Sequence, residues 1–387
     1  MLIKISTYPI RMNLQQFGTI ETEQGVANAM LCIDQDRPGE AMIHWWMSSN
    51  TSAGQAVLVK LNPITANNFN LELVTVYQSD KGGSLYAPHP SKLNFEDING
   101  YHVTLKKTND SFEGEWVHTN GGKGQIKFTP HKPVAKITPT ELTTWANFKK
   151  WINDVRTKNQ GSIFRGHGSS TYRLKTTLCR AGRNRLERYC AETLSEFQPE
   201  VETVLNMRIN LKDGDDYAML LGLAQHHGLP TPLLDWTRSP YIAAFFAFSD
   251  AIEKDFDSKK NGSIRIYQLT NEFIQKMQSP SVTVPFYRPY IAPLRIGPRN
   301  NMRLQAQQGH FLVTNLADIE SHIRKIEITD EKQYLSAVDL PIACASEALQ
   351  DLAFMGLTAA TLFPGLDGLC RKMKLEMLAN NSAASSD

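Results

Sequence analysis

A chain of 387 residues with 41% apolar and 21% charged side chains has ordinary globular composition, and its length favours two domains over one. A formal net charge of only +2 excludes a chain-wide requirement for a nucleic-acid partner, and no apolar run approaches the length of a membrane span. The five cysteines are odd in number and lack CxxC spacing, which argues against a disulfide framework or a zinc knuckle. The N-terminus lacks the apolar core of a signal peptide, so we expect a soluble cytoplasmic protein without a membrane partner.

The charges are distributed unevenly along the chain. Residues 155–186 contain eight cations and no acid, and residues 273–317 contain five cations and no acid. Two such segments form a phosphate-binding surface if the fold brings them together. Otherwise they are solvated faces whose acids come from neighbouring segments. The sequence leaves both interpretations open.

The first 130 residues are rich in short β-type runs separated by turn residues. Asn120-Gly121-Gly122 marks the clearest turn, because its residues tolerate positive φ. The regular spacing predicts a meander, a sandwich or a small barrel. No chemical constellation stands out, and the adjacent Trp45 and Trp46 are interpreted as core side chains in preference to an exposed binding face. The runs are GEAMIHWWMS, QAVLVKLNP, NLELVTVYQ, YHVTLKKT, SFEGEWVHT and GQIKFTP.

A linker over residues 131–138 separates this β-rich domain, residues 1–130, from a second domain over residues 138–387. Thr138-Pro139-Thr140-Glu141 combines a capping threonine, a proline and a glutamate three residues after the cap, which predicts the start of a helix. Apolar residues at helical spacing then follow from Trp145 to Val155.

The rest of the second domain predicts a mixture of strands and helices, so the fold class is α+β. A short buried strand ends in Arg165-Gly166-His167, and Ser239-Pro240 opens a helix that runs through Ser249. Helical patterns are also present at 184–212, 215–228 and 345–355, and strand patterns at 232–237, 262–269, 302–315 and 323–329; the third of these strands carries Gln305 and Gln307.

Common catalytic and metal motifs are missing from the sequence. His226 and His227 are adjacent, and no HExxH motif or cysteine cluster accompanies them, so we expect one histidine packed inside and one at a helix end. No P-loop, Rossmann turn or GxSxG elbow is present. We therefore predict no metal cofactor. The notable residue is Arg165, because an arginine after a buried strand is costly without an anion, and a phosphate or a structural carboxylate would both satisfy it.

Four motifs together resemble the FRG domain, a family named for its Phe-Arg-Gly motif. They are IFRGH at 163–167, LAQHHGLPTPLLDWTRSPYIAAFFAF at 223–248, RLQAQQGHF at 303–311 and GLTAATLFPGLDGL at 356–369. The resemblance spans roughly residues 140 to 375. The block order of the FRG domain in turn resembles the ADP-ribosyltransferase fold, which implies a split sheet in the second domain and NAD as substrate.

The resemblance assigns roles to individual residues. Arg165, with Gly166 and His167, corresponds to the first-strand position that holds NAD, and Thr237 to the position that orients the nicotinamide ribose. Gln307 corresponds to the third position, where the related enzymes carry a glutamate. The side chains available to stack on nicotinamide are Tyr172, Trp236 and Phe245.

Gln307 is a departure from the enzyme pattern, because a glutamine can hold a hydroxyl but carries no charge to stabilise an oxocarbenium ion. Asp235 supplies that charge if it is catalytic. The alternative is structural, since an acid next to a turn often caps backbone amides or pairs with an arginine such as Arg238. Both roles stay open.

The function expected from the resemblance is that of an NAD-dependent ADP-ribosyltransferase acting as a bacterial toxin or anti-phage effector. The two basic segments favour RNA or DNA over protein as acceptor, and a nucleobase acceptor must be single-stranded or extruded. The N-terminal domain is then expected to recognise a substrate or an antitoxin. The alternative is a non-enzymatic nucleotide- or nucleic-acid-binding module, which the glutamine at position 307 favours.

Overall fold

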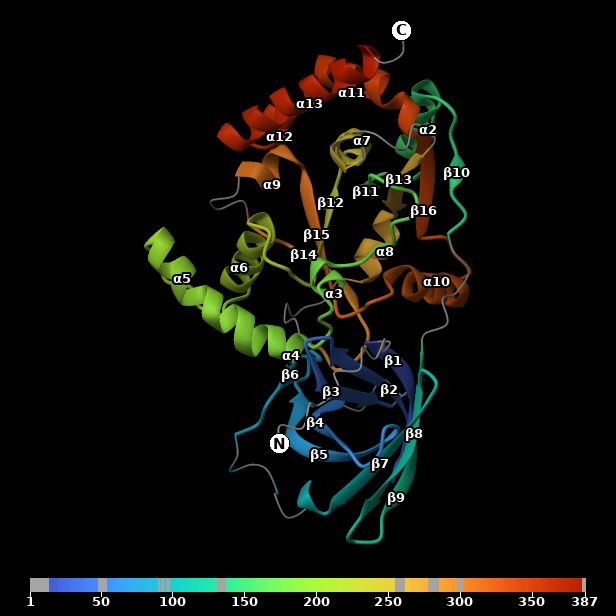
Figure 1. Cartoon of the computed structure of the whole chain (residues 1–387), viewed down its shortest axis with the longest axis vertical. Coiled ribbons are helices and arrows are strands. Elements are labelled where there is room, and N and C mark those ends of the chain that lie inside the picture. The colour runs from blue at the N-terminus through green and yellow to red at the C-terminus, as the bar shows by residue number, and fades with distance from the viewer. Residues whose placement is uncertain are drawn as a thin grey trace, which may run out of the picture.

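The computed structural model of the chain describes residues 14–47, 54–89, 91, 94, 98–130, 137–254, 262–277, 285–297 and 302–384. Two sheets organise it, one of nine strands followed in the chain by one of seven (Figure 1). Among the described helices, none has the length and apolar character that crossing a membrane requires. The predicted linker lies almost wholly outside the described residues.

The first sheet closes into a barrel. Its order is β4-β3-β2-β1-β9-β8-β7-β5-β6, and β4 also pairs with β5, so eight strands form a closed ring and the short β6 extends beside β5. The barrel is one of the three architectures that the spacing predicts. The strands are β1 (Gln15–Thr22), β2 (Gly25–Asp34), β3 (Arg37–Trp46), β4 (Gln55–Pro63), β5 (Asn68–Ser79), β6 (Leu85–Tyr86), β7 (Tyr101–Thr108), β8 (Ser111–His118) and β9 (Lys123–Pro130).

The barrel interior is filled with apolar side chains. Residues along β9 alternate between exposed and buried, as expected for a strand with one face in a core. The interior cluster includes Ile33, Phe112 and Phe128, each at most 1% exposed. The sequence reasoning missed β1 and β2, because polar and small residues interrupt their apolar pattern.

The second sheet has the order β10-β16-β13-β11-β12-β15-β14, and its pairs are antiparallel except β10–β16. Its strands are β10 (Thr140–Glu141), β11 (Ile163–His167), β12 (Leu233–Thr237), β13 (Ser263–Leu269), β14 (Ile291–Leu294), β15 (Gly309–Thr314) and β16 (Leu335–Pro341). The helices around it are α2 (Trp145–Lys158), α3 (Thr177–Arg180), α4 (Leu186–Arg188), α5 (Ser195–Leu205), α6 (Gly214–His226), α7 (Pro240–Lys254), α8 (Asn271–Lys276), α9 (Met302–Ala306), α10 (Ile319–Asp330), α11 (Ala345–Phe354), α12 (Ala359–Leu362) and α13 (Leu366–Ala384). Both strands and helices are abundant, so the α+β class is confirmed.

The predicted helix start at Thr138-Pro139-Thr140-Glu141 is wrong. Thr140 and Glu141 instead form β10, which pairs in parallel with β16. The helix begins at Trp145, where the side chain of Thr144 accepts a hydrogen bond from the amide of Asn147 at 3.2 Å. The observed capping threonine lies six residues after the predicted one, because the intervening Thr140 and Glu141 pair with β16 in the sheet.

Two predicted strands are partly or wholly helical. Residues 323–329 belong to α10, whose first turn is capped by the side chain of Asp318; the β-branched isoleucines of that segment misled the prediction. The predicted strand at 302–315 contains α9 and then a turn, and only Gly309–Thr314 is extended. Gln308, with φ of 47°, makes the left-handed turn between them. Gln305 and Gln307 therefore lie in a helix and a turn and not on a strand.

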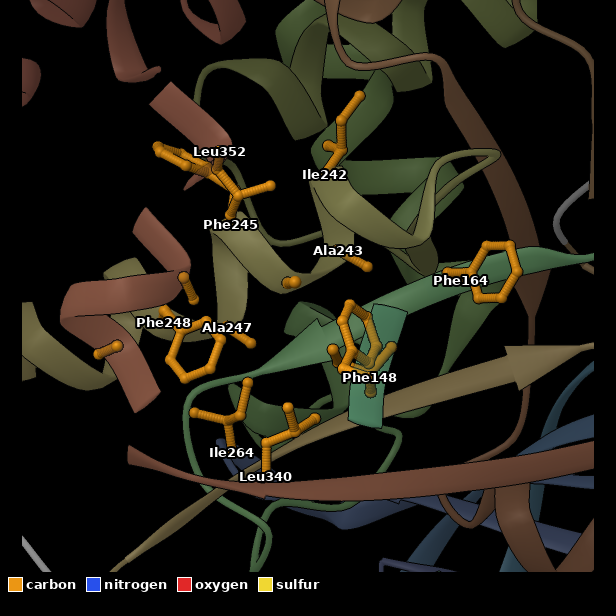
Figure 2. Packing of buried hydrophobic residues seen from close by; sticks show 14 of the residues in the cluster. Phe148, Phe164, Ile242, Ala243, Phe245, Ala247, Phe248, Ile264, Leu340 and Leu352 are labelled. Atoms are coloured by element: carbon orange, nitrogen blue, oxygen red, sulfur yellow. The ribbon is translucent and has the colours of Figure 1, made fainter. Parts of the chain in front are cut away.

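The helix α7 fixes the position of β11 in the second sheet. Figure 2 shows Phe248 of α7, Phe164 of β11 and Phe148 of α2 in one apolar cluster. The alanines of α7 allow a close approach to the strand. A Cβ on Gly166 would lie only 1.9 Å from the carbonyl oxygen of Ala243, so the second residue of the Arg-Gly pair must be glycine for packing reasons.

A buried carboxylate joins the barrel to the second domain. Asp34, at the end of β2, is fully buried and accepts hydrogen bonds from the amides of Asn184 and Arg185 at 2.7 and 3.0 Å. Its other oxygen lies 2.9 Å from Nη1 of Arg188, which also binds Asp36. A buried charge is tolerated when it is satisfied in this way, so the barrel is held firmly against the segment that leads into α5.

Candidate functional site

The site lies where two neighbouring strands of the second sheet diverge. β11 forms five residue pairs with β13, and β12 forms five with β15, but β11 and β12 pair only at Phe164 and Thr237. Past that pair the strands separate, and a pocket of about 730 Å³ occupies the space between them and the surrounding helices. This volume lies within the usual range for small-molecule sites, roughly 300–1,000 Å³.

The fold brings cations from both acid-free segments to this pocket. Arg173, Lys175 and Arg180 come from the first segment, and Arg303 comes from the second. The alternative interpretation, in which neighbouring segments supply the acids, holds for Arg173, which pairs with Glu320. Lys175, Arg180 and Arg303 share one concave surface instead.

Some pocket cations are neutralised by acids. Arg173 contacts Glu320 at 3.0 Å, Lys254 contacts Asp250 at 2.8 Å and Arg371 contacts Glu253 at 2.9 Å. The others form no ion pair with any acid in the described part of the chain; they are Arg165, Lys175, Arg180 and Arg303. Of the two pocket acids, Asp250 is paired with Lys254, and Asp235 interacts electrostatically with Arg165 and Arg303, so the pocket carries an excess of positive charge.

Arg165 bridges the gap between the diverging strands. Its Nη1 donates to the main-chain carbonyl of Asp235 on β12, and its Nε donates to Nε2 of His167 at 3.2 Å. Burial lowers the pKa of the Arg165 guanidinium, and the carboxylate of Asp235 opposes that shift. Burial and the charge of Arg165 together lower the pKa of His167 to about 3, so this imidazole is neutral at pH 7.

Asp235 lies at the mouth of the pocket with its side chain exposed. Its Oδ2 accepts a hydrogen bond from Nε2 of Gln225 at 2.7 Å, and the Oε1 of the same glutamine accepts from the hydroxyl of Thr231. Asp235 and Arg238 are both described and form no ion pair with each other. The carboxylate is therefore oriented by a neutral amide at the pocket wall.

Thr237 and Gln307 lie together, but their contact runs through the main chain. The hydroxyl of Thr237 donates to the carbonyl of Gln307 at 2.8 Å and accepts from the amide of Ser239 at 3.1 Å. The side-chain nitrogen of Gln307 donates to the carbonyl of Leu362 at 3.0 Å. These bonds fix the turn after α9 against β12, and they engage the hydroxyl of Thr237 and the side-chain nitrogen of Gln307.

The aromatic side chains that line the pocket differ in part from the three that the sequence predicted to stack on nicotinamide. Tyr172 is exposed and lines the pocket, whereas Trp236 borders the pocket but is only 3% exposed and packs in a core cluster. Phe245 is also 3% exposed and packs in the core, and its neighbour Phe246 lines the pocket in its place. On the opposite wall, Phe363 lies between two guanidinium groups, with Arg303 at 4.3 Å and Arg371 at 4.6 Å from its ring centre. Such cation–π contacts hold both arginines in place.

Several pocket residues were missed from the sequence. The expectation of one packed histidine was wrong, because His226 lines the pocket in the last turn of α6 and His227 caps that helix. Gln225 precedes them and orients Asp235. The basic-segment analysis could have indicated Arg180 and Arg303, but nothing in the sequence predicts that Arg371 shares their pocket.

One known protein family matches the part of the chain that forms much of this pocket. A family model described as FRG domain matches residues 160–256, a range that includes β11, β12 and α7. A search of curated proteins found no match. Among solved structures, a redesigned β-barrel is similar at 14% identity over 31% of this chain and 93% of its own, with a TM-score of 0.20.

Proposed function

Since the chain contains an FRG domain, we propose that its pocket binds NAD as a substrate and that the protein is an ADP-ribosyltransferase. The observation that carries the proposal is the divergence of β11 and β12, which opens a pocket of about 730 Å³ with four cations that form no ion pair in the described residues and the carboxylate of Asp235. A dinucleotide offers a complementary pattern, because its diphosphate is anionic and its nicotinamide ribose becomes cationic as the glycosidic bond breaks.

The reaction assigns a distinct task to each wall of the pocket. The bond between nicotinamide nitrogen and ribose C1′ breaks, and its electron pair leaves with neutral nicotinamide. The acceptor then forms a new bond to C1′ and gives up its proton. Asp235, oriented by Gln225, is the group we assign to stabilising the transient positive charge on the ribose. Tyr172, an exposed aromatic side chain of the pocket wall, is the residue we assign to the nicotinamide ring.

We extend the proposal to a macromolecular acceptor, with RNA or DNA preferred over protein, and to a role as a bacterial toxin or anti-phage effector restrained by an antitoxin. Support for a nucleic-acid acceptor comes from the two acid-free basic segments, both of which contribute cations to the pocket. An acceptor base reaches C1′ only from a single strand or after extrusion from a duplex.

A non-enzymatic nucleotide-binding module is the second candidate, and Gln307 favours it. The position carries no charge, and its side-chain nitrogen is already bonded to Leu362. Asp250, the other acid of the pocket, is paired with Lys254. A binding module would need the cations of the pocket but not the carboxylate of Asp235.

Transfer of label from NAD separates these candidates. Purified protein is mixed with NAD labelled in its ADP-ribose part and with cellular RNA, DNA or protein, while nicotinamide release is measured in parallel. We expect the wild-type protein to transfer label and Asp235→Asn to lose about 100-fold in rate with NAD affinity little changed. The control is Asp215→Asn, an exposed acid on α6 outside the pocket, which should retain full activity.

Two outcomes would count against the enzyme. Folded wild-type protein that binds NAD but releases no nicotinamide and transfers no label is a binding module. Folded protein that neither binds nor consumes NAD overturns both candidates. Loss of transfer in Asp215→Asn to the same extent as in Asp235→Asn would remove the assignment of Asp235.

A further inference from the structure

The loop that precedes α3 is fixed by a buried carboxylate. Glu320 of α10 is 5% exposed and accepts from the amide of Leu174 at 2.8 Å. The same carboxylate contacts Nε of Arg173 at 3.0 Å and the hydroxyl of Tyr267 at 3.1 Å. Because three groups converge on it, Glu320 holds the backbone that leads directly into Lys175.

Lys175 and Arg180 form a linked pair at the end of this loop. Nη1 of Arg180 donates to the main-chain carbonyl of Lys175 at 2.9 Å, which ties the guanidinium to the backbone of the lysine, and both side chains line the pocket. Thr176 between them caps α3 by accepting from the amide of Cys179 at 3.2 Å. Neither cation meets an acid in the described residues. Two like charges on a rigid loop repel each other, and a bound anion removes that cost.

Arg165 is less free than this pair to act as the anion ligand. Its Nη1 and Nε are engaged with Asp235 and His167, and these two bonds span the gap between β11 and β12. Releasing either bond would leave a polar group unsatisfied next to the pocket. The charge of Arg165 remains in the pocket, where the charge of Arg180 lowers its pKa further.

We propose that Lys175 and Arg180 form the anion subsite of the pocket and that this subsite binds the diphosphate of the nucleotide ligand. Arg165 is then a positioning residue, which ties β11 to β12. The proposal rests on the proposed function in assigning the diphosphate to NAD. Two adjacent cations match two linked phosphates, and lysine with arginine is a common phosphate-binding pair. The subsite lies on a loop wall of the pocket, whereas Arg165, the residue to which the resemblance to ADP-ribosyltransferases assigns NAD, lies on β11.

Isothermal titration with inorganic pyrophosphate and with ADP-ribose tests the subsite. In Lys175→Ala/Arg180→Ala we expect both affinities to fall by about 100-fold, the effect of removing two charge-assisted contacts. The matched control is Arg156→Ala/Lys158→Ala, which removes two exposed cations of the same acid-free segment outside the pocket and should leave both affinities unchanged. Circular dichroism checks that both double variants are folded.

Arg165→Gln tests the positioning role. We expect this variant to bind pyrophosphate within about fivefold of wild type, since only a neighbouring charge is lost. Its kcat for NAD should fall much further than its KM rises, because the strands that carry the reacting groups are no longer tied. Loss of pyrophosphate binding equal to that of the Lys175/Arg180 double variant would overturn the assignment.

The subsite and the enzyme can fail separately. Normal NAD turnover and pyrophosphate binding in Lys175→Ala/Arg180→Ala would refute the subsite and leave the enzyme standing. Pyrophosphate binding that depends on Lys175 and Arg180, with no NAD turnover by the wild type, would support the subsite and refute the enzyme. If single-stranded RNA binds through this pair and pyrophosphate and ADP-ribose do not, the diphosphate assignment is overturned.

Discussion

The two sheets of this protein differ in how their strands close, and the difference decides where a ligand can bind. In the barrel, eight strands pair around a complete ring, and their inward side chains fill the interior. In the second sheet, β11 and β12 share one residue pair and then separate, and the pocket lies at that opening. A complete ladder satisfies its own backbone groups and leaves no room, whereas an opened ladder exposes polar groups that side chains and ligands must satisfy.

Arg165 illustrates this difference at the level of one bond. Past Phe164 and Thr237, a ladder bond between β11 and β12 is replaced by a side chain that reaches the carbonyl of Asp235. The arginine thus does what a backbone amide does elsewhere in the sheet, and it adds a positive charge to the opening.

The comparison between the filled barrel and the opened second sheet can be tested by creating a cavity in the barrel, which should give the largest change in the free energy of unfolding. Phe128 is fully buried in the barrel interior, so Phe128→Ala should lower the free energy of unfolding by about 4 kcal/mol. Phe354→Ala is the control, because Phe354 is 93% exposed and its removal should change stability by less than about 0.5 kcal/mol. Urea unfolding followed by tryptophan fluorescence measures both. Equal stability of the two variants would show that the barrel is not tightly filled.

A smaller effect is expected from a methyl group on the strand next to the pocket. Gly166→Ala should cost about 3 kcal/mol, because its Cβ would clash with the carbonyl oxygen of Ala243 and push β11 from α7. The barrel offers the counterpart Gly39→Ala, where an added Cβ meets nothing within 4 Å and stability should stay within about 0.5 kcal/mol. The same urea titrations apply, and an unaffected Gly166→Ala would mean that the strand and helix are not in close contact.

The smallest expected effect is a dependence of stability on pH, to which one buried histidine in the barrel and one in the second sheet contribute. Burial lowers the pKa of His44 on β3 to about 4, and burial with Arg165 lowers that of His167 on β11 to about 3, against 6.5 for an ordinary histidine. The unfolded chain therefore binds more protons below pH 6.5. The stability from each neutral imidazole is complete above that pH and is lost as the pH falls toward the folded pKa.

Between pH 6 and 4.5, each histidine should remove about 2 kcal/mol of stability. Urea midpoints across this range should fall less steeply for His44→Gln than for wild type. A slope unchanged by this substitution would mean that His44 is protonated in the folded protein.

The sequence predicted much of the fold and part of the site. The barrel strands β3 to β9 other than the short β6 were predicted, as were β11, β12, β13 and the helix α7. The strand predicted over residues 302–315 was wrong before Gly309, because tertiary contacts override the local sequence pattern there. Gln308 turns the chain, and the hydroxyl of Thr237 donates to the carbonyl of Gln307. The family was identified from its motifs, and the model of that family matches residues 160–256.

By itself, the sequence predicted the FRG motifs that the family model matches over residues 160–256, the α+β class and a short strand that carries Arg165, because these depend on local patterns and on motif spacing. The structure corrects one detail, since Arg165 lies in the middle of β11 and not at its end. Only the tertiary structure decided which cations share the pocket and which are neutralised. Glu320 reaches Leu174 across 146 positions, and Gln307 reaches Leu362 across 55. Such contacts depend on how strands diverge and helices pack in three dimensions, and no local pattern encodes them.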